Sequence, residues 1–171
     1  MSAYDAIVYD LDGTLVELAV DWEATANDGL AALRAAGIDP PKTDLWSLFE
    51  VADATGHRPT LEAIVSEHER AGARNSRLLE TASELPQSVP VAVCSLNCQR
   101  ACEIALERHS LADHVDTVVG RDTVSTEKPD PEGLLTAIDR IGGSPAQTVF
   151  IGDSPRDERT AQRAGTAFEY V

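Results

Sequence analysis

Short runs of consecutive apolar residues alternate along this chain with segments whose apolar residues recur every three or four positions. The runs are AIVY (6–9), VAVC (91–94), TVV (117–119), TVFI (148–151) and AFEYV (167–171). Unbroken apolar runs of this length are typical of strands buried on both faces, and the periodic segments predict amphipathic helices. Such alternation predicts an α/β fold, with about five strands in a doubly wound parallel sheet.

The helices expected within this framework span 78–85, 99–109, 132–141 and 156–164. Asn97 is the expected N-cap of the second of these helices, and Asp130 that of the third. In a doubly wound sheet, ligands gather beyond the carboxyl ends of the strands. That edge is where the chemistry of the chain is expected.

One connection is much longer than the fold requires. A strand, helix, strand unit needs roughly thirty residues, and the stretch from Asp10 to Ser95 is far longer. Its sequence shows three amphipathic helical stretches. We therefore predict a small all-helical cap inserted at 17–75, with 1–16 and 76–171 forming the core.

The composition narrows the classes of function. The chain carries 29 acidic and 14 basic side chains, for a formal net charge of −15, and such a surface is poorly suited to a nucleic-acid partner. We find no apolar run of about eighteen residues and no secretory signal, which predicts a cytoplasmic protein with no membrane partner. The spacing of Cys94, Cys98 and Cys102 is unlike a zinc site and favours small buried side chains. The oligomeric state stays open.

Lysine is scarce, since only Lys42 and Lys128 are present. Carboxylates hold water tightly, whereas the long stem of lysine exposes apolar surface. Concentrated salt therefore favours a surface with many acidic residues and few lysines. At about 1 M salt the screening length falls to roughly 3 Å and self-repulsion largely disappears. We hypothesise a salt-adapted organism. A surface that docks a basic partner is the alternative, although the acids are spread through the chain.

The stretch DLDGTL (10–15) places two carboxylates where an apolar strand ends. In an extended chain, Asp10 and Asp12 face the same side, and a hard divalent cation such as Mg²⁺ relieves their repulsion. Gly13 permits a sharp turn with free backbone N–H groups, a concavity suited to phosphate. By itself the pair is equally compatible with an ordinary capped loop.

A second acidic stretch, GDSPRD (152–157), follows another strand. It directs Asp153 and Asp157 to the same edge, where several carboxylates require a cation. Ser95 can donate a hydrogen bond to an anion, and Lys128 adds a positive point charge. These groups together are the parts needed to transfer a phosphoryl group.

In their order and spacing, the motifs DLDGTL, VCS, EKPDP and GDSPRD resemble those of the haloacid dehalogenase superfamily, and DERTAQRAG is similar to its phosphoglycolate phosphatase-like members. The resemblance implies a Rossmann-like core, a small helical cap after the first motif, and a Mg²⁺-dependent phosphatase acting on a small soluble phosphate ester. An acid at Asp12 favours phosphate chemistry over dehalogenation.

Position by position, the resemblance implies that Asp10 is the nucleophile that forms an aspartyl-phosphate and Asp12 the general acid and base. Asp10, Asp12, Asp153 and Asp157 would hold the metal. Ser95 and Lys128 would grip the phosphoryl oxygens. The remaining phosphate contacts would be Leu11, Gly13, Thr14, Leu96 and Asn97.

The chain departs from the family in one motif, because relatives commonly have Ser-Asn where this chain has Ser95-Leu96-Asn97. The alternatives are a phosphosugar mutase, a non-catalytic binding protein with the same fold, and a receiver-like signalling domain, which would lack the helical insertion. The substrate is not apparent from the sequence. Candidate anion contacts in the cap are Arg58, Arg70 and Arg74, for which a solvated helix charge is the simpler interpretation.

Overall fold

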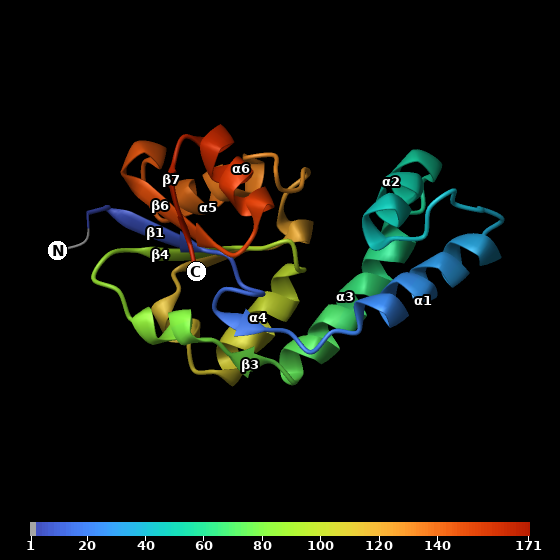
Figure 1. Ribbon diagram of the computed structural model, residues 1–171, viewed down its shortest axis with the longest axis horizontal. Coiled ribbons are helices and arrows are strands. Elements are labelled where there is room, and N and C mark those ends of the chain that lie inside the picture. Colours follow the sequence, from blue (N-terminus) through green and yellow to red (C-terminus); the bar gives the residue numbers. More distant parts are fainter. Residues whose placement is uncertain (1–2) are drawn as a thin grey trace.

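A five-stranded parallel sheet forms the centre of the protein, as the computed structural model of residues 3–171 shows (Figure 1). Its strand order is β5-β4-β1-β6-β7. The strands are β1 (Ala6–Tyr9), β4 (Val91–Cys94), β5 (Thr117–Val119), β6 (Thr148–Gly152) and β7 (Ala167–Tyr170). The predicted α/β class and the five predicted strands are confirmed, with boundaries that differ by at most one residue.

Both faces of the sheet are covered by helices. On one side, Ile7 and Tyr9 pack in a cluster with buried residues of α4 (Gln99–Arg108). On the other side, Val8 packs with residues of α5 (Glu132–Arg140) and α6 (Pro155–Ala164). Successive residues of β1 therefore face opposite cores, which is why the strand reads as an unbroken apolar run.

Three helices between β1 and β4 form a separate body to the right of the sheet in Figure 1. They are α1 (Trp22–Ala35), α2 (Leu45–Thr55) and α3 (Arg58–Arg74). Leu33, Leu48, Phe49 and Leu61 are among the residues of their own buried apolar cluster. A short antiparallel ribbon, β2 (Val16–Glu17) with β3 (Arg77–Leu78), connects this body to the sheet.

The helix predicted over 78–85 is wrong. Leu78 lies in β3 and is largely exposed, and only a short 3-10 helix, Glu80–Glu84, follows. The Leu79 N–H donates to the carbonyl of Leu15 (3.0 Å), so this stretch pairs with the chain that leaves β1. Pro86 then prevents a helix from continuing.

The predicted cap of α4 is also wrong. The helix begins at Gln99, as expected, but its N-cap residue is Cys98, and the Asn97 side chain does not cap it. The N–H groups of Cys98 and Gln99 instead donate to the carboxylates of Glu69 (2.9 Å) and Asp122 (2.7 Å). Carboxylates from two other segments therefore supply the cap.

The Asp130 carboxylate accepts from the Glu132 N–H (2.9 Å), as its predicted capping role requires, although the helix boundary falls at Pro131. The three cysteines are buried and unpaired. Within residues 3–171, no helix combines the length and the apolar character that crossing a membrane requires.

Candidate active site

Three carboxylates meet at the carboxyl edge of the sheet. Asp10 follows β1, Asp153 follows β6, and Asp157 lies in the first turn of α6. Each offers an oxygen atom within 4.8 Å of the others. The Asp10 N–H donates to the carbonyl of Ile151 (2.8 Å), which fixes the ends of β1 and β6 side by side. Oxygen ligands so arranged suit a hard divalent cation.

A single ammonium group lies among these acids. Lys128 Nζ donates to Asp10 Oδ1 (3.0 Å) and to Asp157 Oδ1 (2.7 Å), and it lies 4.9 Å from the centre of the Phe150 ring. Burial alone would lower the pKa of Lys128, but the charges of Asp10 and Asp157 overcome this effect, so its pKa is raised. The group stays positively charged.

One ammonium does not balance three acids. Burial raises the pKa of the Asp10 carboxyl above its usual range, although Lys128 acts in the opposite direction. Burial also raises the pKa of Asp153, and the charge of Asp157 adds to the shift. Burial and the charge of Asp157 thus both disfavour the ionised forms of Asp10 and Asp153. The donor set therefore fits a bound divalent cation.

Asp12 lies beside this cluster. Its Oδ1 accepts from the Leu18 N–H (2.9 Å), which orients the carboxyl group. Burial raises the pKa of Asp12, and the charges of Asp153 and Glu69 act in the same direction. A carboxyl group with a raised pKa is suited to donating a proton.

The turn after Asp10 is tight. Gly13 has φ of +84°, and a Cβ at this position would lie 2.1 Å from Asp153 Oδ2. Its N–H donates to the Val16 carbonyl (2.8 Å), and the Thr14 N–H donates to that of Leu11 (3.1 Å). The turn therefore has the predicted glycine, but the expectation that these two N–H groups are free is wrong, because the turn itself uses them.

The loop after β4 brings Ser95 and Asn97 to the cavity. Ser95 Oγ donates to Asn97 Oδ1 (3.0 Å) and accepts from the Asn97 N–H (3.1 Å). Because the hydroxyl has a single hydrogen, this hydrogen must rotate away from Asn97 before it can reach a phosphoryl oxygen. Leu96 also lines the cavity.

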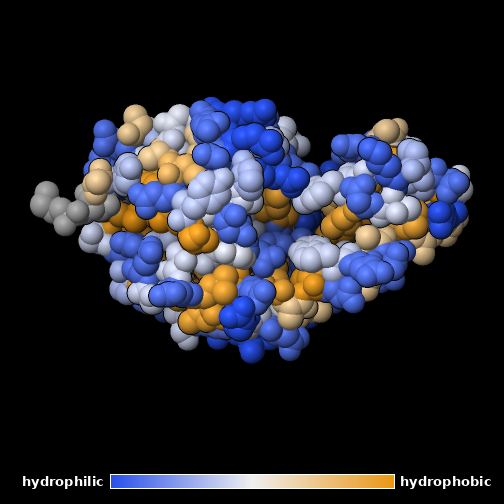
Figure 2. All heavy atoms as spheres, in the orientation of Figure 1, coloured by the Kyte–Doolittle hydropathy of each residue, from blue (hydrophilic) through white to orange (hydrophobic). Residues whose placement is uncertain are grey.

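All these side chains open into one cavity of about 510 Å³ between the sheet edge and the α1–α3 body, where Figure 2 shows a hollow. The helical body contributes Trp22, Leu45, Trp46 and Glu69, and α6 contributes Arg156 and Arg159. Sequence reasoning missed these residues. Arg156 could have been noted, because it stands between two motif acids, but no local pattern marks Glu69 or the tryptophans.

The arginines that the sequence suggested as anion contacts do not line this cavity. Arg58 pairs with Asp53 and Glu127, and Arg70 pairs with Glu67. Arg156 instead lies over the Trp46 ring, with its Cζ 4.7 Å from the ring centre. This contact connects α6 to α2 of the helical body, and both residues line the cavity.

Two phosphatases are similar to this chain in sequence. A phosphoglycolate phosphatase of Xanthomonas campestris pv. campestris is 27% identical over 94% of this chain and 79% of its own length. An N-acetylmuramic acid 6-phosphate phosphatase of Pseudomonas aeruginosa is 28% identical over 94% and 78%.

Solved structures have the same fold. CbbY from Rhodobacter sphaeroides, solved in complex with phosphate, matches with a TM-score of 0.72 at 18% identity, over 98% of this chain and 85% of the other. A subfamily IA hydrolase of the HAD superfamily from Geobacter sulfurreducens matches with a TM-score of 0.63 at 22% identity, over 97% and 86%. The family model described as haloacid dehalogenase-like hydrolase matches residues 7–171, so this chain belongs to that family.

Proposed function

We propose that this protein is a Mg²⁺-dependent phosphatase that hydrolyses a small phosphate ester through a phosphorylated Asp10. The proposal rests on the family, on the phosphatases among its relatives, and above all on one observation: a buried carboxylate, Asp10, bonded to Lys128 beside two further carboxylates. A nucleophile, a cation site and a fixed positive charge in one place are what phosphoryl transfer requires.

Asp10, Asp153 and Asp157 would hold Mg²⁺ through their side chains, and Asp12 would add its backbone carbonyl. The bound ion would neutralise negative charge on the phosphoryl oxygens. Lys128 would hold Asp10 in position and contact a phosphoryl oxygen. Ser95 would donate its hydroxyl hydrogen to another oxygen.

The reaction then has two steps at the side chains. A carboxylate oxygen of Asp10 attacks phosphorus, the bond to the alcohol oxygen breaks, and Asp12 gives its proton to the departing alcohol. Asp12, now ionised, takes a proton from water, and the hydroxide attacks the phosphorylated Asp10. Inorganic phosphate leaves, and both carboxyl groups return to their starting states.

The cavity favours a small anionic substrate. Its 510 Å³ are roughly the volume of a small-molecule site. Arg156 and Arg159 line it, and neither forms an ion pair with any residue of the described chain. We propose that α1–α3 act as a cap that excludes large substrates and that these guanidinium groups contact the part of the substrate beyond its phosphate.

The test is phosphate release from a panel of small phosphate esters, with and without Mg²⁺, at several KCl concentrations. We expect release only with Mg²⁺, and we expect Asp10→Asn to abolish it while the far-ultraviolet circular dichroism stays unchanged. Full activity in Asp10→Asn would rule out the covalent mechanism. Conversion of a phosphosugar into an isomer without phosphate release would instead indicate a mutase.

A further inference from the structure

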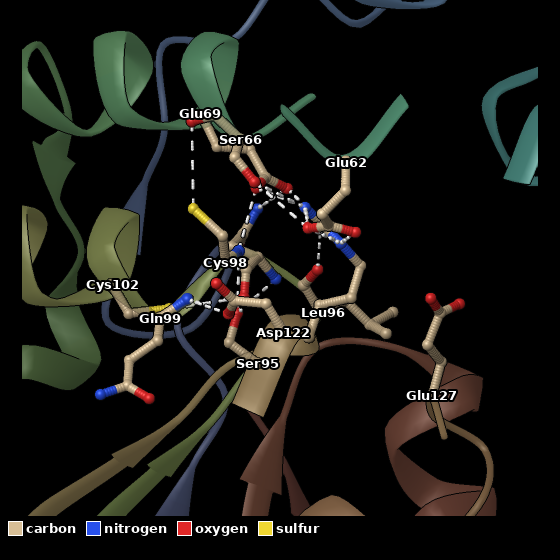
Figure 3. A network of polar contacts seen from close by, with 12 residues as sticks. Glu62, Ser66, Glu69, Ser95, Leu96, Cys98, Gln99, Cys102, Asp122 and Glu127 are labelled. Atoms are coloured by element: carbon tan, nitrogen blue, oxygen red, sulfur yellow. Dashed lines mark hydrogen bonds and ion pairs between the residues drawn. The ribbon is translucent and has the colours of Figure 1, made fainter. Parts of the chain in front are cut away.

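A fully buried carboxylate of the inserted helices reaches into the cavity. Glu69 of α3 is 1% exposed and lines the site beside Ser95 and Asn97. Its Oε1 accepts from Asn97 Nδ2 (3.2 Å), and its Oε2 accepts from the Cys98 N–H (2.9 Å). Figure 3 shows Glu69 on α3 directed toward Cys98 and the loop that precedes it. A residue of the helical body thus holds both the loop and the start of α4.

The charge of Glu69 is compensated within the same network. Arg121, which follows β5, donates to Glu69 Oε1 (2.6 Å) and Oε2 (3.0 Å) and to the Leu96 carbonyl (2.7 Å). It also donates to Glu62 Oε1 (2.6 Å). Both guanidinium and carboxylate are almost fully buried, so each depends on the other for its polar contacts.

This arrangement has a consequence for an anionic substrate. A carboxylate has no hydrogen to donate to a phosphate oxygen, so Glu69 is unsuited to contact the substrate's phosphate itself, although Arg121 compensates its charge. Its oxygens are occupied by Asn97, Cys98 and Arg121, which leaves it suited to fix the groups that do contact the substrate. The amide of Asn97 has two N–H groups, and only one donates to a protein atom among the described residues. The second is available to a ligand in the cavity.

We propose that Glu69 is a positioning residue of the phosphate site. From α3 it fixes the side-chain amide of Asn97, and this amide contacts the phosphoryl group. Asn97 lies one position after the place where the family motif commonly has its asparagine. The inference rests on the proposed function. Leu96 stands where relatives commonly have asparagine, and the bond to Glu69 holds the amide of the following Asn97 beside the cavity. Cap and phosphate loop are thereby joined by a direct contact.

Glu62 provides a matched control. Its carboxylate also bonds to Arg121 and lies on the same face of α3, about two helical turns before Glu69. It makes no hydrogen bond to residues 95–98 in the described structure. Glu69→Gln and Glu62→Gln each remove one negative charge from the same arginine, but only Glu69→Gln places an amide N–H against the donors of Asn97 or Cys98.

The experiment measures the dissociation constant of inorganic phosphate by calorimetry in the presence of Mg²⁺, and kcat and KM for p-nitrophenyl phosphate. We expect Glu69→Gln to weaken phosphate binding about tenfold or more, in line with a misplaced buried donor, and Glu62→Gln to weaken it less than about threefold. If Glu69→Gln only lowered the stability of the protein, less of it would be folded, but the folded protein would bind phosphate with unchanged affinity. The dissociation constant therefore separates a positioning role from a purely structural one. Equal phosphate affinity in the two variants would overturn the inference.

A double-mutant cycle tests the route through Asn97. In an Asn97→Ala background, Glu69→Gln should cause little further loss of phosphate affinity, because the group it positions is gone. Additive losses would contradict the proposed route. If Glu69→Gln does not fold, Glu69→Asp serves in its place, because it keeps the charge for Arg121 and withdraws it from Asn97.

Failure of the proposed function is distinguishable. Wild-type protein that binds phosphate but hydrolyses no ester would refute the phosphatase assignment, while the affinities of the Glu69 variants would still decide the positioning role. Wild-type protein that binds no phosphate would refute both.

Discussion

Replacing Lys128 with methionine removes the one ammonium that residues 3–171 place among the buried acids, while keeping a side chain of similar length. Lys128 Nζ lies 3.0 Å from Asp10 and 2.7 Å from Asp157, and its side chain is 5% exposed. Loss of one partner of a buried ion pair leaves an uncompensated charge, which costs about 3–5 kcal/mol of unfolding free energy. Because two carboxylates lose the same partner, we expect a loss near the upper end of this range.

The assay is urea unfolding followed by circular dichroism, with and without Mg²⁺. Since Mg²⁺ would supply the missing positive charge, it should stabilise Lys128→Met more than the wild type, and binding at a hundredfold excess over the dissociation constant contributes about 2.7 kcal/mol. Lys42→Met is the control. Lys42 is the other lysine of the chain and is exposed, so its loss should change stability by less than about 0.5 kcal/mol. A loss below about 1 kcal/mol in Lys128→Met would refute the reasoning.

Three further outcomes are expected. Lys128→Arg should reduce kcat for phosphate esters far more than it lowers the urea midpoint, because a planar guanidinium cannot replace a compact point charge between two carboxylates; unchanged turnover would argue against this role. Gly13→Ala should lower the free energy of unfolding by about 1–3 kcal/mol because of the positive φ, and it should also weaken Mg²⁺ binding because the added Cβ would meet Asp153. Gly37→Ala is the control for the backbone contribution, since Gly37 has φ of +83° and a Cβ there would meet no atom within 4 Å. Equal Mg²⁺ affinities in the two variants would contradict the contact with Asp153. The melting temperature should rise with KCl toward molar concentrations, as expected for a net charge of −15, and a maximum at low salt would refute adaptation to salt.

The amount that sequence reasoning recovered differs between the core and the inserted helices. The strands of the core were predictable because each is buried on both faces, so nearly every residue of 6–9, 91–94 and 148–152 must be apolar or small. The helices α1 and α2 were predictable for a related reason, because each keeps one apolar stripe and ends near a glycine.

The segment 78–85 misled the same reasoning. Its leucines recur with helical spacing, but the structure places Leu78 in a ribbon beside the chain that leaves β1. A partner distant in sequence therefore decided the conformation, and a local pattern carries no information about that partner.

The amino-acid sequence by itself determined the sheet and the acids at its edge. Parallel strands all present their carboxyl ends to one side, so Asp10, Asp153 and Ser95 follow from strand positions alone. Tertiary structure decided how these groups are held and what surrounds them. Glu69 and Arg121 lie 52 positions apart and meet only because α3 packs against the loops beyond β4 and β5. The physical reason is that burial of charge depends on which surfaces come together, whereas hydrophobic periodicity records only which face of an element is buried.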